Sequence, residues 1–289
     1  MNGFLFINKP KGPTSFAVIR KVRQALGIKK IGHSGTLDPE ATGLLILAVG
    51  TATRLLPYLP SEPKHYSFRI QFGTTTDTLD RAGTITDRDK PFPSRRQIED
   101  VLPAFTGTIL QRPPDYSAIK VRGARAYTLA RNNREIDIPP REITIHSLTL
   151  QRYNPADGEA FLSTVCSTGT YIRSLARDVA EKAGTIGYAS AIHRSAIANF
   201  TTEHAIPVDT VQREWESTLH TISDIFSHCP AYTAADTEIR SLACGRDIVL
   251  ENGSKGKRVF VYNTEKELVA ITEQVTANRY HPVKVFIKP

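Results

Sequence analysis

Cysteine is scarce in this 289-residue chain, and its three cysteines form no C-x-x-C pair. An odd number without that spacing fits neither a disulfide framework nor a zinc ribbon, so we expect buried thiols at Cys166, Cys229 and Cys244. Long hydrophobic runs are missing as well. The N-terminal apolar run is too short for a signal peptide, and the longest later run, GLLILAVG, is far below the roughly 20 residues that a bilayer requires. We therefore expect a protein of the reducing cytoplasm that has no membrane partner.

Two common catalytic loops are also missing. GHSG, at residues 32–35, suggests a nucleophilic serine, but the elbow pattern G-x-S-x-G requires glycine where the chain has Thr36. The phosphate-binding pattern G-x-x-x-x-G-K-[ST] occurs nowhere, and neither do repeats or low-complexity tracts. The sequence therefore favours neither a serine hydrolase nor a P-loop nucleotidase.

The composition is that of a soluble globular protein with a basic bias. Hydrophobic residues make up 40% of the chain and charged residues 23%, which is enough for a large core. Lysine and arginine number 37 against 29 acidic residues, so the net charge is +8. This excess favours polyanionic partners such as nucleic acid.

Apolar periodicity predicts an α+β fold. Runs of β-branched and aromatic residues predict strands at 4–8, 44–50, 65–73, 142–153 and 159–167. The last two are separated by NPADG and predict an antiparallel hairpin. Helical patterns lie at 15–27, 94–105 and 168–184. Because the order of elements is irregular, we expect an antiparallel sheet and not a βαβ repeat.

The first predicted helix, SFAVIRKVRQALG, has the clearest pattern. Its apolar face comprises Phe16, Ile19, Val22 and Leu26. Ser15 is the candidate N-cap, and Gly27 ends the helix.

A basic polar segment interrupts the pattern at residues 111–142. Its stretch from residue 112 to residue 134 carries Arg112, Lys120, Arg122, Arg125, Arg131 and Arg134 against Asp115 alone, interleaved with Tyr116 and Tyr127. Guanidinium groups and aromatic faces suit phosphates and bases of looped RNA. A solvated loop whose tyrosines pack inward explains the same pattern. Beyond residue 230, short strands predict a separate, small β-rich module.

Asp38 stands out because it is the first acidic residue in the chain, after seven lysines and arginines. With Pro39 it predicts a helix start, Asp38 as N-cap and Pro39 at the first helical position. A carboxylate at a helix N-terminus among cations would have its charged form favoured. Such a group could also act as a nucleophile or stabilise an electron-poor carbon.

Five motifs follow one another in the chain: FINKPKGPTSFAVIRKVR, GHSGTLDPEATGLLILAVGTATRLLPYL, KHYSFRIQFG, RPPDYSAIKVRGARAYTLAR and GTYIRSLARDVA. Over most of residues 3–200 the chain thereby resembles the TruB family of tRNA pseudouridine synthases. The resemblance implies a pseudouridine synthase fold, with a mixed, mainly antiparallel sheet flanked by helices. It places the catalytic domain at residues 1–229, with an RNA-clamping insertion at about 111–142. Residues 230–289 resemble the small RNA-binding PUA-type module.

The resemblance implies an isomerase that turns uridine 55 of the tRNA T-loop into pseudouridine without cofactor or metal. The bond from N1 to C1′ is broken, the uracil turns, and a bond from C5 to C1′ replaces it. Asp38 matches the family's nucleophile, whether it attacks the sugar, attacks the ring or drives elimination. Arg173 matches that carboxylate's partner, and Tyr66 the tyrosine that stacks on the flipped uracil. Without the family, Arg173 could lie on an exposed helix face and Tyr66 in the core.

RNA contacts are implied at further positions. His33 matches the histidine that opens the T-loop, Lys64 is a basic flank of the Tyr66 motif, and Ile192 would line the uracil pocket. The family commonly has two arginines after that aliphatic residue, whereas this chain has His193 and Arg194. The cations expected to contact RNA are Arg194, Lys9, Lys120, Arg122, Arg125 and Arg131.

Two other functions use the same surface. One is the modification of ribosomal RNA with a guide particle, as in a guide-dependent relative of the family. The other is tRNA folding by a non-catalytic chaperone. The insertion YSAIKVRGARAY resembles the bacterial stand-alone type. We therefore expect a monomer that acts on the tRNA T-arm without guide RNA. The set of Asp38, Tyr66 and Arg173 favours an enzyme over a chaperone.

Overall fold

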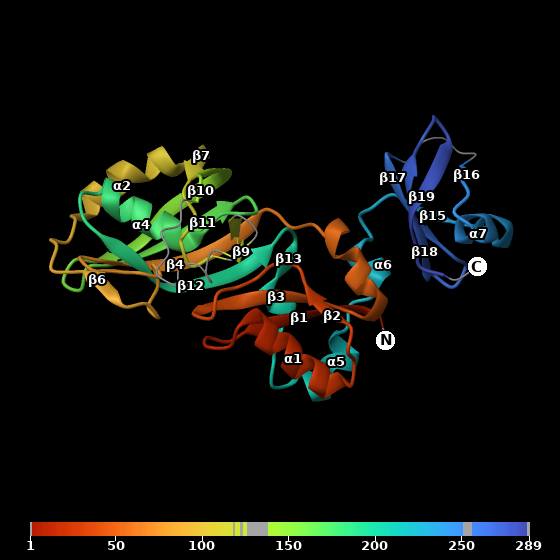
Figure 1. Cartoon of the computed structure of the whole chain (residues 1–289), viewed down its shortest axis with the longest axis horizontal. Coiled ribbons are helices and arrows are strands. Elements are labelled where there is room, and N and C mark those ends of the chain that lie inside the picture. The colour runs from red at the N-terminus through yellow and green to blue at the C-terminus, as the bar shows by residue number, and fades with distance from the viewer. Residues whose placement is uncertain (1, 118, 122–123, 126–137, 251–255, 288–289) are drawn as a thin grey trace.

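The computed structural model describes residues 2–117, 119–121, 124–125, 138–250 and 256–287. Within these residues, ten strands form one sheet along which the core of the protein is built (Figure 1). The strand order is β14-β1-β3-β12-β4-β11-β10-β7, with β2 beside β3 and β13 beside β12. The strands are β1 (Gly3–Lys9), β2 (Ile31–His33), β3 (Ala41–Val49), β4 (Lys64–Phe72), β7 (Gly107–Gln111), β10 (Arg141–Asn154), β11 (Glu159–Cys166), β12 (Gly187–Ile197), β13 (Phe200–Thr201) and β14 (Ile206–Pro207).

The sheet is mixed and mainly antiparallel. Only the pairs β3–β12 and β1–β14 are parallel, and the predicted hairpin appears as β10 and β11. Among the described residues that precede 230, the helices are α1 (Ser15–Leu26), α2 (Arg95–Val101), α4 (Ile172–Lys182), α5 (Val211–Thr218) and α6 (Ile222–Ile225), with 3-10 turns η1 (Gly50–Tyr58), η2 (Leu102–Phe105) and η3 (Thr202–His204). The expected α+β fold is confirmed, and so are the strands and helices predicted from apolar periodicity.

Strand alternation divides the interior into two cores. On β1, Leu5 and Ile7 face the core that α1, α2 and α4 cover, whereas Phe4 and Phe6 face the opposite core under η1 and α6. All four side chains are at most 3% exposed, as expected for a central strand that is buried on both faces. Burial on both faces therefore fixes the register of the sheet, and the loops between its strands start from fixed positions.

Helix α1 differs from its predicted pattern at its start. Thr14, not Ser15, is the N-cap, because its hydroxyl accepts a hydrogen bond from the Ala17 amide at 3.0 Å. Phe16 is 60% exposed, so its predicted place in the apolar face is wrong, and Val18 is buried instead. The predicted end is confirmed: Gly27 has φ +67°, a backbone conformation that glycine adopts without strain.

The C-terminal residues form a β-rich module, drawn in blue in Figure 1. Its sheet has the order β15-β17-β18-β19-β16. Its elements are β15 (Ala231–Thr233), α7 (Asp236–Ala243), β16 (Ile248–Val249), β17 (Arg258–Tyr262), β18 (Leu268–Gln274) and β19 (Arg279–Val285). The module has its own core, and Phe260 stacks on Phe226 beside α6 with ring centroids 4.7 Å apart. A boundary between residues 229 and 230 stays a prediction.

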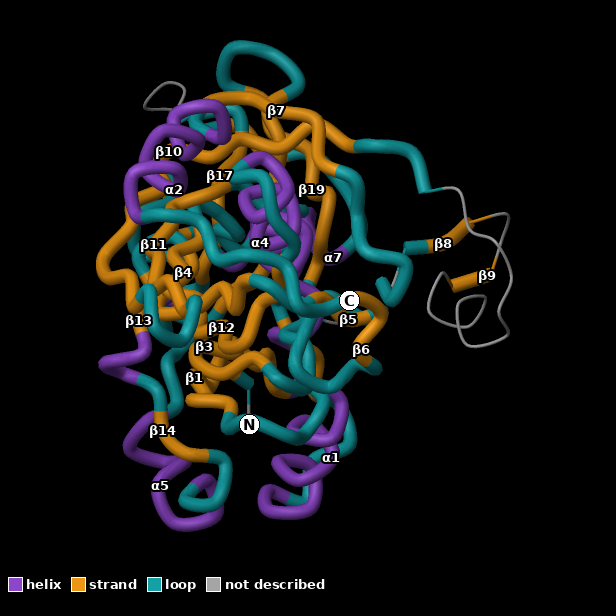
Figure 2. The backbone as a smooth tube through the Cα atoms, turned by 90° about the vertical axis from the view of Figure 1, so that its left-hand side faces the viewer, coloured by secondary structure: helices purple, strands orange, loops and turns teal. Residues whose placement is uncertain are grey.

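The basic insertion is described only in part. Strands β5 (Thr75–Thr76) and β6 (Ile85–Asp87) form one small pair, and a second small pair, β8 (Lys120–Val121) and β9 (Ala124–Arg125), lies to one side of the main body (Figure 2). Lys120 and Arg125 are cross-strand neighbours in that hairpin. Their side chains, and all of Arg122 and Arg131, lie outside the described residues.

The cysteines differ in exposure more than their spacing predicted. Cys166 is buried, and burial raises the pKa of its thiol to about 11. Cys229 is partly buried, and Cys244 is exposed at the end of α7, so the expectation of three buried thiols is wrong. Among the described residues, no helix has both the length and the apolar character that crossing a bilayer would demand.

Candidate active site

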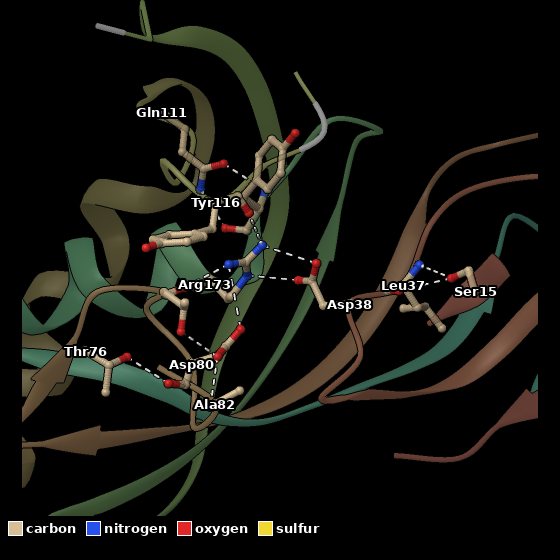
Figure 3. Close-up of polar contacts among 11 residues, drawn as sticks. Ser15, Leu37, Asp38, Thr76, Asp80, Ala82, Gln111, Tyr116 and Arg173 are labelled. Atoms are coloured by element: carbon tan, nitrogen blue, oxygen red, sulfur yellow. Dashed lines mark hydrogen bonds and ion pairs between the residues drawn. The ribbon is translucent and has the colours of Figure 1, made fainter. Parts of the chain in front are cut away.

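Asp38 and Arg173 form the ion pair at the centre of the site (Figure 3). Arg173 Nε donates to Asp38 Oδ2 at 2.9 Å and Nη2 donates to Oδ1 at 3.2 Å, so the carboxylate is held at two points. The arginine side chain is 5% exposed and the aspartate side chain 36%. The pair therefore offers a positioned carboxylate to solvent while the cation that holds it is buried.

The helix start predicted at Asp38 is wrong. Asp38 lies in a turn in which its carbonyl accepts from the Ala41 amide at 3.1 Å, and β3 begins at Ala41. The backbone of Leu37, the residue before Asp38, forms two hydrogen bonds with Ser15. The Ser15 hydroxyl donates to the Leu37 carbonyl at 3.0 Å and accepts from the Leu37 amide at 2.9 Å. Asp38 therefore starts no helix, and it is held by Arg173 and, through the Leu37 peptide, by this buried serine.

Lys9 anchors the other side of the same turn. Its ammonium is fully buried and donates to the carbonyls of Pro10 at 2.9 Å, Pro39 at 3.1 Å and Ala41 at 2.7 Å. The predicted contact of Lys9 with an RNA phosphate is wrong, because three backbone carbonyls enclose this cation. Burial lowers the pKa of Lys9 to about 8, and the nearby charge of Asp38 opposes that shift.

This pKa predicts how stability depends on pH. An unfolded lysine titrates near 10.5 and the folded one near 8, so between these values the unfolded chain binds more protons. The contribution of Lys9 to the free energy of unfolding should therefore increase as pH rises from 8 to 10.5. Urea unfolding of wild type and Lys9→Met should show that the stability difference grows over this range. Lys21→Met, at an exposed lysine, controls for the lost charge; a difference independent of pH would contradict the prediction.

Arg173 also contacts groups that the sequence did not predict. Its Nη1 donates to the Thr78 carbonyl at 2.8 Å, its Nη2 donates to the Tyr116 carbonyl at 3.0 Å, and Nη1 lies 3.7 Å from Asp80 Oδ2. Asp80 is buried and accepts from the Thr78 hydroxyl at 2.7 Å. Figure 3 shows Arg173 between the two carboxylates. The only signal in the sequence was the carboxylate pair in TDTLD, at residues 76–80 shortly after the strand predicted at 65–73.

Tyr66 and Arg194 are cross-strand neighbours on β4 and β12. Arg194 is 1% exposed and donates to the carbonyls of Leu44 at 2.8 Å and Gly35 at 3.1 Å. Its predicted contact with RNA is wrong, because this guanidinium is enclosed by the protein. Burial raises the pKa of Tyr66, and the charge of Arg194 and a hydrogen bond to it act in the opposite direction. Arg194 thus connects the Tyr66 hydroxyl to the loop that leads to Asp38.

His33 and Lys64 lie beside that loop. His33 Nδ1 accepts from the Gly35 amide at 3.2 Å, and burial, followed by the charge of Arg194, lowers the pKa of this histidine. Lys64 Nζ donates to Thr168 Oγ1 at 3.1 Å, and burial lowers its pKa as well. A methyl group built on Gly35 would lie 3.8 Å from Lys64 Nζ, so the lysine borders the same loop. Contacts of His33 and Lys64 with RNA stay predictions.

Ile192 and Tyr171 complete the surroundings. Ile192 is 7% exposed and belongs to the same apolar cluster as Tyr66, a position compatible with the pocket wall expected from the sequence. His193 next to it shares a 2.9 Å hydrogen bond with Thr42. Tyr171 was not predicted; burial raises its pKa, and the charges of Arg141, Asp38 and Arg173 act on its phenol. No group of three or more metal-ligating side chains occurs among the described residues.

Known structures identify the class of fold. A chain in a solved Cbf5–Nop10–Gar1 complex superposes with a TM-score of 0.70 at 23% identity, covering 99% of this chain and 85% of that one. A chain of an archaeal box H/ACA Nop10–Cbf5 complex gives a TM-score of 0.69 at 19% identity, covering 99% of this chain and 86% of that one. The pseudouridine synthase fold expected from the sequence is therefore confirmed.

Sequence relatives identify the family. The N-terminal domain of TruB family pseudouridylate synthases matches residues 23–172. A tRNA pseudouridine synthase B of Synechococcus sp. (strain CC9311) is 43% identical over 87% of this chain and 86% of its own length. The protein of that name from Dehalococcoides mccartyi (strain CBDB1) is 38% identical over 100% of this chain and 97% of its own. The chain belongs to the TruB family of pseudouridylate synthases.

Proposed function

We propose that this protein converts uridine 55 in the T-loop of tRNA to pseudouridine, with Asp38 as the nucleophile. The observation that carries the proposal is the ion pair in which a partly exposed carboxylate is held at two points by a buried arginine. Relatives named tRNA pseudouridine synthase B match the chain along almost its whole length. Family and geometry together favour an isomerase that acts on tRNA.

The chemistry assigns a separate task to each side chain. Asp38 supplies the oxygen that acts on the nucleotide while the N1–C1′ bond breaks and the C5–C1′ bond forms. Arg173 provides the opposite charge and keeps both carboxylate oxygens in place, so little reorganisation accompanies the reaction. The ring of Tyr66 would stack on the uracil, and Ile192 would border it, while the base turns within the pocket.

Access to the uridine requires that it leave its loop. Extruding a base costs a few kcal/mol, which stacking, hydrogen bonds to its edges and phosphate contacts repay. His33 and Lys64 border the loop next to Asp38, and they would contact the splayed nucleotides. The insertion at 111–142 would close on the T-arm and supply the remaining cationic contacts.

The proposal is tested with purified protein and an unmodified tRNA transcript, without guide RNA or added metal. Carbodiimide treatment followed by reverse transcription should give a stop that reports pseudouridine at position 55. A transcript with cytidine at that position controls for the site and should give no stop. Conversion of another uridine instead, or conversion only after a guide RNA is added, would contradict the proposed function.

A further inference from the structure

Gln111 lies where the basic insertion leaves the sheet. It is the last residue of β7, and it pairs across the ladder with Arg141, the first residue of β10, at which the chain returns. Its side chain is polar, yet the residue is only 2% exposed. A buried amide is costly unless both of its ends are hydrogen-bonded, so its partners indicate what it does.

Both ends of the Gln111 amide bind one residue, Tyr171. Its Oε1 accepts from the Tyr171 amide at 2.8 Å, and its Nε2 donates to the Tyr171 carbonyl at 3.1 Å. Tyr171 is the N-cap of α4 and has no side-chain cap hydrogen bond of its own. Its carbonyl also accepts the first hydrogen bond of the helix, from Leu175 at 3.0 Å. Gln111 thus holds the helix two residues before Arg173.

The residues after Gln111 bind the same helical turn through their backbone. The Arg112 carbonyl accepts from the Ser174 hydroxyl at 2.8 Å, and the Tyr116 carbonyl accepts from Arg173 Nη2 at 3.0 Å. That same Nη2 donates to Asp38. The root of the insertion and the Asp38 carboxylate therefore share one guanidinium, and Gln111 adds two hydrogen bonds from its own side chain to those that join the root to the helix.

We propose that Gln111 is a positioning residue for the reaction: its amide holds the start of α4, and with it Arg173, in register with Asp38. The inference rests on the proposed function for its kinetic readout. A shift of about 1 Å in a reacting geometry can cost about a hundredfold in rate. Losing the two hydrogen bonds should thus slow chemistry while the surface that contacts RNA stays in place.

Gln111→Met keeps the length of the side chain and removes both hydrogen bonds. We expect its single-turnover rate on the tRNA transcript to fall about 30-fold, which is less than the hundredfold loss for a shift of about 1 Å because the expected shift is smaller. The Kd for that transcript should be unchanged. Gln151→Met is the matched control, because that glutamine is exposed and donates to Ser163 on the neighbouring strand. Amide exchange at Tyr171 should become faster in Gln111→Met, a readout that does not depend on activity.

Gln111→Glu separates positioning from a general structural role. Its carboxylate still accepts from the Tyr171 amide but cannot donate to the Tyr171 carbonyl, whereas the protonated acid can. The rate relative to wild type at the same pH should therefore recover as pH falls, and this variant decides the matter if Gln111→Met does not fold. A wild-type rate in Gln111→Met, or equal losses in rate and RNA affinity, would overturn the inference. Inactive wild-type protein would instead contradict the proposed function. Amide exchange at Tyr171 would still test whether Gln111 holds the start of α4.

Discussion

Replacing Asp38 with asparagine should lower the single-turnover rate of pseudouridine formation by about 10⁴-fold or more, because the variant lacks the oxygen nucleophile. The change is isosteric, and the amide oxygen can still accept one of the two hydrogen bonds from Arg173. The turn itself is held by Ser15 and Lys9, so it should persist. Binding of the tRNA transcript, measured by filter retention, should therefore remain close to that of wild type.

The control for this experiment is Asp100→Asn, which makes the same chemical change at an exposed position on α2. It should leave both the rate and the affinity unchanged. Conversion by Asp38→Asn at the wild-type rate would remove the catalytic assignment of Asp38. Loss of RNA binding by Asp38→Asn alone would indicate that the carboxylate orders the binding surface and does not act on the nucleotide.

The strands of the sheet were predictable because short apolar runs and alternating apolar residues are local sequence patterns typical of buried strands. On β1, apolar residues serve two cores, and the short run at 4–8 predicted a strand before any contact was known. The pairing of Asp38 with Arg173 was different. It joins positions 135 residues apart, and spacing within one chain carries no information on that contact. Only the family resemblance predicted it.

The errors have a common physical origin. Lys9 and Arg194 count as positive charges in the sequence, but backbone carbonyls enclose both cations in the folded protein. Whether a cation contacts a ligand depends on which acceptors the fold brings to it, and those acceptors are distant in sequence. Asp80 and Gln111 were missed for the same reason. Asp38 followed by proline fits both a helix cap and a turn before a strand, and tertiary hydrogen bonds decided between them.

Arg173→Ala should reduce both catalysis and stability. The residue is 4% exposed, and its removal leaves Asp38 and Asp80 without their shared cation. Losing one partner of a buried ion pair costs about 3–5 kcal/mol of unfolding free energy, and a value toward the lower end is expected because Asp38 is partly exposed. Since Asp38 would no longer be oriented, the single-turnover rate should fall about 10³-fold. Urea unfolding and single-turnover kinetics on the tRNA transcript measure the two effects.

Lys182→Ala provides the control, since Lys182 is an exposed cation in the last turn of the same helix. It should change the rate little. Arg173→Lys sharpens the test, because an ammonium restores the charge but cannot hold both oxygens of Asp38 in the fork geometry of a guanidinium. It should recover stability more than rate. If Arg173→Ala lost rate and RNA affinity equally, Arg173 would be a phosphate-binding arginine, and the orienting role derived from its contacts with Asp38 would be wrong.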